Sequence, residues 1–230
     1  MEAEKTTSEK VFNALKTGVL TVARIVLGIL IAIQINAWNG ERKRVNFEKE
    51  ILTQIRKNLK KDSIALAWYS KNAKNAIGNG KKILNLRPNE SNDSIQYWLA
   101  DVIYFDRFRS LTNGFEVLKS KGLGNVSNKQ LVFLLGAYYD DKSIRITRGL
   151  EDIESIFTDE WLGIITKHVI DFEFSNYMQL DNYELFTKPG EARNLLKLSI
   201  ENWRGSAVTV NSGLKSVQNM ISMIDSEIKQ

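Results

Sequence analysis

The sequence has no cysteine and only one histidine, His168, among its 230 residues. A chain without cysteine forms no disulfide and offers neither a thiolate metal site nor a cysteine nucleophile. A single imidazole also excludes a zinc or iron centre built from several histidines. His168 lies in the apolar stretch WLGIITKHVI, where a lone histidine usually has a structural role. The sequence therefore predicts no metal site and no bound cofactor.

Proline is also scarce. The two prolines, Pro88 and Pro189, leave most of the chain free to form long helices, because proline interrupts a helix interior. The hydrophobic content of 43% is ordinary for a folded chain and is enough for a core. No stretch shows a clear alternation of polar and apolar residues, as a half-buried strand does. We therefore predict an all-α fold.

The motifs of common enzymes are missing as well. The chain has no G-x-S-x-G elbow and no H-E-x-x-H pair. The run GNGKK at Gly78–Lys82 lacks the spacing of a phosphate-binding loop and the strand that precedes one. The acidic pairs Asp140-Asp141 and Asp159-Glu160 consist of neighbours, whose side chains point apart on a helix. The sequence thus predicts a protein without catalytic activity.

The chain does contain a long apolar stretch near its start, GVLTVARIVLGILIAIQINAW, from Gly18 to Trp38. At about 1.5 Å per residue this stretch would reach about 31 Å as a helix, close to the ~30 Å hydrocarbon core of a bilayer. Tryptophan favours the interface between hydrocarbon and water, and three cations follow at once. We predict a transmembrane helix that ends at Trp38, with Trp38, Arg42, Lys43 and Arg44 in contact with lipid headgroups.

This assignment divides the chain into an N-terminal tail (1–17), a transmembrane helix (18–38) and a soluble helical domain (39–230). Two other interpretations remain open. A buried core helix is one, although apolar runs of this length are seldom buried in small domains. A cleaved signal peptide is the other, although Ile35-Asn36-Ala37 is a poor cleavage site and a basic run follows it.

Arg24 is the one charge inside the apolar stretch. A charge near the bilayer centre costs roughly 2.5 kcal/mol or more, but Arg24 could extend to the nearer surface. Arg24 also shares one helical face with small and polar residues, which is typical of membrane helices that pack together. The helix is therefore either a monomeric anchor or the interface of a homo-oligomer. That face consists of Thr17, Thr21, Arg24, Gly28 and Ala32.

The net charge of +5 is unevenly distributed. Residues 1–61 hold 12 Lys/Arg and 6 Asp/Glu, a balance of +6, whereas residues 140–173 hold 4 Lys/Arg and 9 Asp/Glu, a balance of −5. Cations next to a membrane usually bind anionic headgroups. Few aromatic residues lie among these cations, which argues against nucleic acid as a partner. More cations flank the C-terminal side of the span, which favours a cytoplasmic domain over a periplasmic one.

Two series of apolar residues predict long helices. In the first series, small or apolar residues recur every three or four positions, with interruptions at Asp62 and Gly80. The second series is uninterrupted and gives a coiled-coil seam of more than four heptads. We predict that the first and last helices pack antiparallel in a helical bundle, with an intermolecular coiled coil as the alternative. The first series is Leu52, Ile55, Leu59, Leu66, Tyr69, Ala73, Ala76 and Ile83; the second is Leu196, Ile200, Trp203, Ala207, Val210, Leu214, Val217, Ile221, Ile224 and Ile228.

Shorter helices are expected between these two. Gly122 should end a helix that starts near Asn113, and Ser127 with Gln130 has the spacing of a capping box. We expect Asp140-Asp141 to break or bend the next helix, and a further helix to continue to about Ile170. Residues 171–188 have the least regular pattern.

The stretch GILIAIQINAWNGERKR, residues 28–44, resembles a signature of uncharacterised single-span bacterial inner-membrane proteins. That signature reads G-I-L-I-A-L-Q-I-N-x-W-N-E-x-R-K, and this chain departs from it at Ile33 and Gly40. A second patch, from Phe115 to Gly122 and on to Tyr138-Tyr139, is similar to the Y-E-x-L-K-S-S-G segment of the same family. The resemblance implies a helical protein with one span in the bacterial inner membrane. It implies no activity.

Together these patterns predict a membrane-anchored interaction or sensing module that recruits an unknown protein partner. The alternative is an oligomeric pore, formed by the transmembrane helix, with Arg24 and Gln34 facing inward.

Overall fold

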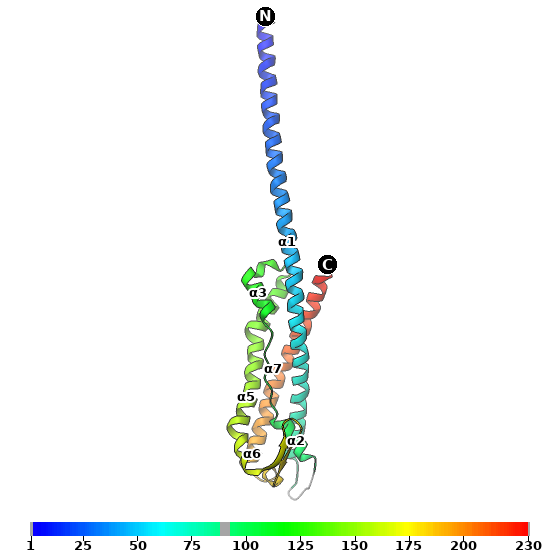
Figure 1. The fold of residues 1–230 in the computed structure, drawn as a ribbon, viewed down its shortest axis with the longest axis vertical. Helices are drawn as coiled ribbons and strands as arrows, with labels where there is room; N and C mark the ends of the chain where they lie inside the picture. Colours follow the sequence, from blue (N-terminus) through cyan, green and yellow to red (C-terminus); the bar gives the residue numbers. More distant parts are fainter. Residues whose placement is uncertain (1, 88–92, 230) are drawn as a thin grey trace. The chain divides into compact units, whose positions relative to one another are not determined.

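The computed structural model of the chain is mostly helical (Figure 1). It describes residues 2–87 and 93–229, with all of their side chains except those of residues 2–15 and Thr17. Contacts divide the chain into one unit that ends at Glu48 and a second that begins at Lys49. Each unit is described by itself. Pro88 and the predicted loop up to residue 92 lie outside the described residues.

The elements follow one another as helices with one short hairpin. The turns η1 and η4 are 3₁₀-helical, and η2 and η3 are single π-helical turns. The α-helices are α1 (Glu2–Leu84), α2 (Ile95–Ile103), α3 (Asn113–Lys121), α4 (Lys129–Ala137), α5 (Ser143–Ile156), α6 (Leu162–His168) and α7 (Glu191–Ile228); the others are η1 (Leu123–Asn125), η2 (Tyr138–Lys142), η3 (Phe157–Trp161), β1 (Val169–Glu173), β2 (Tyr177–Leu180) and η4 (Tyr183–Phe186).

The first unit is the N-terminal part of α1. The helix begins at Glu2 and so includes most of the stretch 1–17 that was predicted to be an N-terminal tail. Gly40 does not interrupt it, because a single glycine in a helix costs only about 1 kcal/mol relative to alanine. The apolar stretch Gly18–Trp38 is therefore helical throughout, as predicted.

The remainder of α1 lies in the second unit and buries one face. All eight residues of the first predicted series are buried, which confirms that seam. The two apparent interruptions, Asp62 and Gly80, are buried on the same face and complete its spacing of three and four. At Gly80 the reason is close packing, because a Cβ there would lie 2.6 Å from Cγ1 of Ile200 on α7.

Polar contacts connect α1 to α7 in reverse sequence order, so the two helices run antiparallel within this unit. Their side-by-side course is visible in Figure 1, where α1 is cyan and α7 orange to red. The contacts are the ion pair of Arg56 with Asp225, the hydrogen bond from Ser70 Oγ to Asn211 Oδ1 (2.6 Å) and that from Arg193 Nη2 to the Leu84 carbonyl (2.9 Å).

The buried face of α7 is rotated from the predicted one beyond Trp203. Val210, Val217 and Ile224 are buried as predicted. The positions predicted at Ala207, Leu214 and Ile221 are only half-buried, and Ser206, Gly213 and Met220 replace them on the buried face. At Ser206 and Gly213 small residues let α5 approach closely: Ser206 Oγ donates a hydrogen bond of 2.7 Å to the carbonyl of Gly149. The sequence reasoning followed the larger apolar side chains and missed this.

The close approach at Gly213 gives a testable prediction. A Cβ on Gly213 would lie 2.4 Å from Cδ1 of Ile146, which is fully buried on α5. We expect Gly213→Val to lower the free energy of unfolding by about 1–3 kcal/mol, as overpacked cores do. Gly205→Val on the same helix meets no atom within 4 Å and should change stability by about 0.5 kcal/mol at most. Urea unfolding followed by circular dichroism distinguishes the two; equal losses would contradict the assigned face.

The all-α prediction is wrong at residues 169–180, where β1 and β2 form an antiparallel hairpin. The predicted helix to Ile170 ends instead at His168. The loop between the strands places Ser175 at φ 68°, a left-handed conformation that tight turns require. The strands are only five and four residues long, so alternation over so few positions did not stand out from a helix end.

From Lys129 to His168 the chain is helical without a break. Asp140-Asp141, predicted to break or bend it, lies in the π-helical turn η2. The predicted helix end at Gly122 is confirmed, with a φ of 100°. The capping box at Ser127 is wrong by one residue, because Asn128 caps α4 and its side chain accepts the Leu131 N–H at 2.9 Å.

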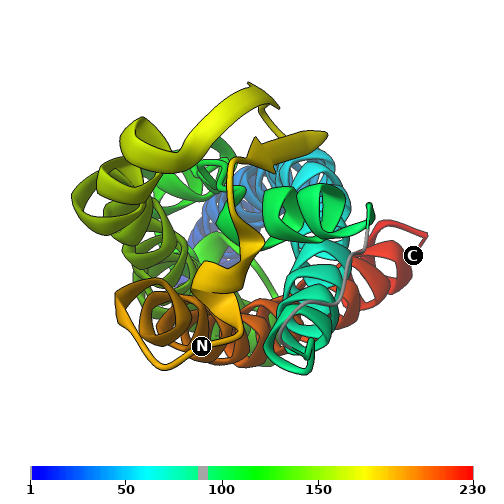
Figure 2. The same cartoon turned by 90° about the horizontal axis from the view of Figure 1, so that it is seen from below.

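The core at the Leu84 end of the second unit is built from α1, α2, η3, α6, β2, η4 and α7. Figure 2 views this end, with α2, the hairpin and η4 nearest the reader. Trp161 and Phe186 are its largest fully buried side chains. The other buried residues of this core are Ile83, Ile95, Leu99, Val102, Ile103, Ile164, Met178, Leu180, Ala192, Leu195, Leu196 and Ile200.

Candidate functional site

The apolar stretch Gly18–Trp38 has no protein cover. Every side chain in it is exposed, and an 18-residue window at the start of this helix has a mean hydropathy of 2.3 with 0% of its residues buried. A helix that is apolar on all sides is stable either inside a core or in a membrane. No other part of this structure buries the most apolar window of this helix. By length and composition the helix is able to cross a bilayer.

The predicted helix–helix interface lies on this stretch. Thr21, Arg24, Gly28 and Ala32 are exposed on one continuous helix. The side chain of Thr17 lies outside the described residues. Gln34, the second residue predicted to face a pore, is exposed as well. Since the structure contains a single chain, self-association and the pore both stay predictions.

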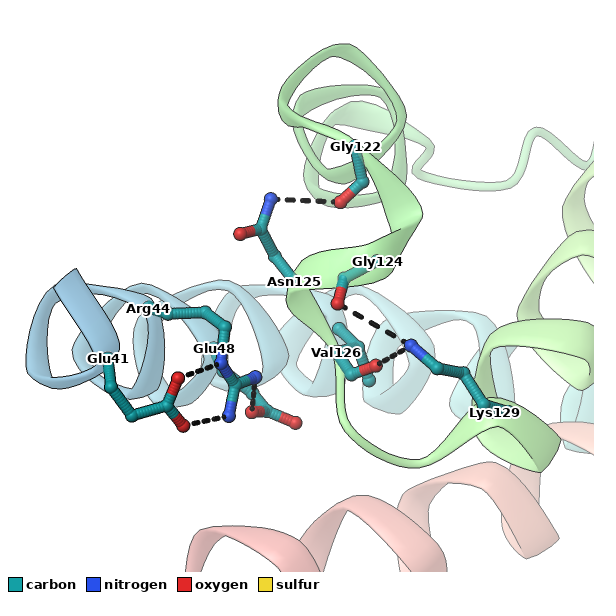
Figure 3. Close-up of polar contacts among 8 residues, drawn as sticks. All are labelled: Glu41, Arg44, Glu48, Gly122, Gly124, Asn125, Val126 and Lys129. Carbon is teal, nitrogen blue, oxygen red and sulfur yellow. Dashed lines mark hydrogen bonds and ion pairs between the residues drawn. The ribbon is translucent and has the colours of Figure 1, made fainter. Parts of the chain in front are cut away.

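The basic residues after the apolar stretch differ in how many of their hydrogen-bond donors are free to contact lipid, as predicted for them. Arg44 binds Glu41 through Nε (2.9 Å) and Nη2 (2.7 Å) and binds Glu48 through Nη1 (3.0 Å), as Figure 3 shows. The hydrogen bond from Arg44 lowers the pKa of Glu41. Much of the donor capacity of Arg44 is therefore used within the helix. Arg42, Lys43 and Trp38 are exposed and remain the stronger predicted headgroup contacts.

In the second unit, Asp62 is the centre of a buried polar cluster and is only 2% exposed. Its Oδ2 accepts hydrogen bonds from Ser110 Oγ (2.5 Å) and the Tyr138 hydroxyl (2.8 Å), and its Oδ1 accepts one from the Leu111 N–H (3.3 Å). All three donors are neutral. Burial raises the pKa of Asp62, and the three hydrogen bonds oppose that rise.

Through Ser110 and Leu111, Asp62 of α1 therefore holds an irregular segment against this helix. Residues 104–112 have no regular secondary structure. One turn before Asp62, the Asn58 amide donates to Asn113 Oδ1 at 2.5 Å. A Cβ on Gly114 would lie 3.2 Å from the Ile55 backbone nitrogen, so glycine permits this close contact. The sequence showed Asp62 only as an interruption of the apolar series.

Tyr139 lies beside this cluster and has the one buried side-chain polar atom, among the described residues, without a hydrogen-bond partner. Its ring stacks on Phe115 at a centroid distance of 4.9 Å. Burial and, secondarily, the charge of Asp62 raise the pKa of Tyr139. The hydroxyl is therefore protonated throughout the physiological range.

A groove of about 1140 Å³ borders Tyr139 and separates the 106–113 segment from α5 and η2. The ion pair of Arg107 Nη2 with Glu154 Oε1 (2.5 Å) and the hydrogen bond from Thr147 Oγ1 to the Phe108 carbonyl (3.3 Å) connect its walls. The groove is lined by Asp106, Arg107, Phe108, Arg109, Ser110, Leu111, Thr112, Asn113, Glu116, Tyr139, Asp140, Ser143, Ile144, Thr147, Arg148, Leu150, Glu151 and Glu154.

The lining of this groove contains charged side chains of both signs and several hydroxyl groups. No cluster of three or more His, Cys, Asp or Glu residues suited to a metal ion occurs among the residues that the structure describes. Sequence reasoning missed the groove, because residues 105–110 (FDRFRS) show no helical period. The mixture of aromatic and basic residues in that segment was the available signal.

His168 lies at the end of α6, with Nδ1 3.2 Å from Asp181 Oδ1. A smaller cavity of about 330 Å³ includes His168 and the residues before α7. The Asp181 contact and the turn into β1 agree with the structural role predicted for His168.

The comparisons with known proteins found no match: no family model, no curated protein and no solved structure resembles this chain. Function must therefore be argued from the chain itself.

Proposed function

We propose that this protein is a single-span membrane protein whose helical domain is a non-catalytic interaction module. The observation that carries the proposal is the apolar helix Gly18–Trp38, which is long enough to cross a bilayer and has no buried residue in its most apolar window. Leaving such a surface in water would be costly, at roughly 25 cal/mol per Å². A bilayer removes that penalty without any protein contact.

The continuity of α1 supports a retained anchor over a cleaved signal peptide. Helical structure continues without a break from Gly18 past Trp38 to Leu84. A cut after Ala37 would fall inside this helix, and Trp38 with the basic residues after it suits a membrane interface. The resemblance of residues 28–44 to single-span inner-membrane proteins points in the same direction. The excess of cations after the span favours a cytoplasmic domain.

The second unit supplies the interaction module. Its antiparallel α1 and α7, with α5 packed on α7, support the proposed helical bundle. The large groove of mixed charge beside α5 suits a polar segment of a partner protein. The absence of catalytic motifs in the sequence leaves recognition as the better-supported activity.

Membrane fractionation tests the anchor. We expect the full chain to sediment with membranes and to resist carbonate extraction. Replacing Leu27 and Ile31 together by arginine should release it, because each central arginine adds about 2.5–3.5 kcal/mol to insertion. Ile64→Arg is the matched control: Ile64 is 73% exposed in the second unit, so this variant should stay in the membrane.

Wild-type protein in the carbonate supernatant would contradict the proposal. If the double variant is retained as firmly as the Ile64 control, the stretch 18–38 is not the anchor. The mass of the protein in mild detergent bears on the alternative function, because a monomer cannot form a pore from a single helix.

A further inference from the structure

β1 has one edge with no strand beside it. The sheet contains only β1 and β2 within the described residues. The Glu173 carbonyl accepts the N–H of Asn176 at 2.9 Å and so faces into the hairpin. Because backbone direction alternates along a strand, the N–H and carbonyl of Phe172 face the outer edge. An extended segment placed there would find its hydrogen-bonding groups available.

Apolar and acidic residues alternate in sequence from Ile170 to Phe174, the residue after β1, and the pairing register is irregular between Val169 and Asp171. Ile170, Phe172 and Phe174 are 64%, 53% and 41% exposed, and Asp171 and Glu173 stand between them. The two carboxylates accept hydrogen bonds from neutral donors, the Tyr177 hydroxyl (2.7 Å) and the Asn176 amide (2.8 Å). These contacts therefore do not neutralise the negative charges of Asp171 and Glu173.

The hairpin is supported from behind. The Phe174 ring contacts an aromatic cluster at centroid distances of 5.4 to 5.7 Å, and Met178 and Leu180 of β2 are buried. A supported edge loses little conformational freedom on binding, which favours affinity. The cluster consists of Tyr104, Phe105 and Phe157.

We propose that the outer edge of β1 is the docking site of an extended segment of a partner protein in which apolar and basic residues alternate. The segment adds a third strand to the hairpin, with main-chain hydrogen bonds for affinity and side chains for specificity. Its apolar residues cover Ile170 and Phe172, and its basic residues lie opposite Asp171 and Glu173. This inference rests on the proposed function and names the partner of that interaction module.

Charge decides between this partner and a second copy of the chain. Two copies of β1 paired antiparallel about a twofold axis would place Asp171 opposite another Asp171 or opposite Glu173. Like charges directly opposite each other destabilise a strand pair, whereas opposite charges contribute roughly 0.2–1 kcal/mol. The acidic balance of residues 140–173 adds a wider attraction for a basic segment.

Peptide binding to the full chain in a non-ionic detergent tests the proposal. The probes are fluorescein-labelled KVKVKVKV and its acidic counterpart EVEVEVEV, measured by fluorescence anisotropy. We expect the basic peptide to bind at least tenfold more tightly. The double variant Asp171→Lys with Glu173→Lys should reverse that preference. Phe172→Pro should weaken binding at least tenfold, because proline is tolerated on an edge strand but removes an outward donor.

A matched charge control separates strand pairing from general attraction. Glu50→Lys with Asp152→Lys makes the same change in net charge at two exposed positions outside the groove, one on α1 and one on α5, and should leave the peptide preference within twofold. Hydrogen exchange should show new protection of the β1 amides when KVKVKVKV binds. Equal losses in both double variants, or no protection of β1, would overturn the proposal. Protection of β1 by dimerisation without peptide would assign the edge to a second copy instead.

The wild type and the β1 variants are also tested by carbonate extraction of their membranes. If the chain is extracted by carbonate, the peptide-binding result can still support the β1 edge. If the peptide preference is absent, the carbonate result can still support the membrane anchor. The two hypotheses therefore fail separately.

Discussion

Trp203→Ala should lower the free energy of unfolding by about 3–5 kcal/mol, the largest effect of any single substitution proposed here. Trp203 is 2% exposed and lies on the buried face of α7. Its indole N–H donates to the Val102 carbonyl at 2.8 Å, so the substitution removes both a large apolar surface and the partner of a buried acceptor.

Urea unfolding of the detergent-solubilised chain, followed by far-ultraviolet circular dichroism, measures this loss. Val208→Ala is the control on the same helix: Val208 is 71% exposed, and its removal should change stability by about 0.5 kcal/mol at most. Trp203→Phe should fall between the two, since it keeps most of the ring but loses the N–H. A loss for Trp203→Ala no larger than for Val208→Ala would contradict the assigned core.

Asp62→Ala should lower the free energy of unfolding by about 2–4 kcal/mol near neutral pH. The substitution leaves the Ser110 and Tyr138 hydroxyls and the Leu111 N–H without their acceptor. Each buried group left unsatisfied costs about 1–3 kcal/mol. Removing a buried carboxylate that lacks a cationic partner among these contacts offsets part of that cost.

The pH dependence of stability gives a second readout for Asp62. Burial raises its folded pKa above the ordinary value of 3.8. This difference in pKa stabilises the folded state most at a pH below about 3.8, where Asp62 is protonated in both states. The stabilisation is lost as the pH rises through the raised folded pKa. Acidification from pH 7 should therefore stabilise the wild type relative to Asp62→Ala, and the measured difference should grow.

The matched control for this titration is Asp62→Asn, which keeps a hydrogen-bond acceptor at this position but has no ionisable group. Its pH profile should therefore run parallel to that of Asp62→Ala. A difference between wild type and Asp62→Ala that shrinks on acidification would show that the folded pKa of Asp62 is lowered, not raised. Both variants are compared in the same detergent and salt.

Periodicity was the most reliable guide to the fold. The α1 series from Leu52 to Ile83 was predicted in full, because large side chains at a spacing of three and four leave one arrangement for a buried face. The same reasoning placed Val210 and Val217 of α7 inside. It misplaced Leu214, because close contact with Ile146 of α5 selects Gly213 there, and hydrophobicity says nothing about closest approach. It also misplaced Ile221, where Met220 is buried instead.

The candidate site was less accessible to sequence reasoning. Asp62 and Tyr138 are 76 residues apart, and only the fold brings them into contact. The groove has an irregular wall, which carries no period. The hairpin at 169–180 was missed because tertiary contacts with α2 support strands too short to be recognised alone. The helical course and exposure of the apolar stretch Gly18–Trp38, by contrast, follow from a local pattern in one helix.

The spacing of Asp62 and Gly80 on α1 limits how the length of this chain can vary. Gly80 follows Asp62 by 18 residues, which is five whole turns at about 3.6 residues per turn. The two positions therefore point in the same direction from the helix axis. Inserting a single residue between them would turn Gly80 by about 100° and bring a bulkier neighbour against Ile200. Any relative of this protein should keep that interval, or alter it only by a number of residues that restores the phase, such as seven or eleven.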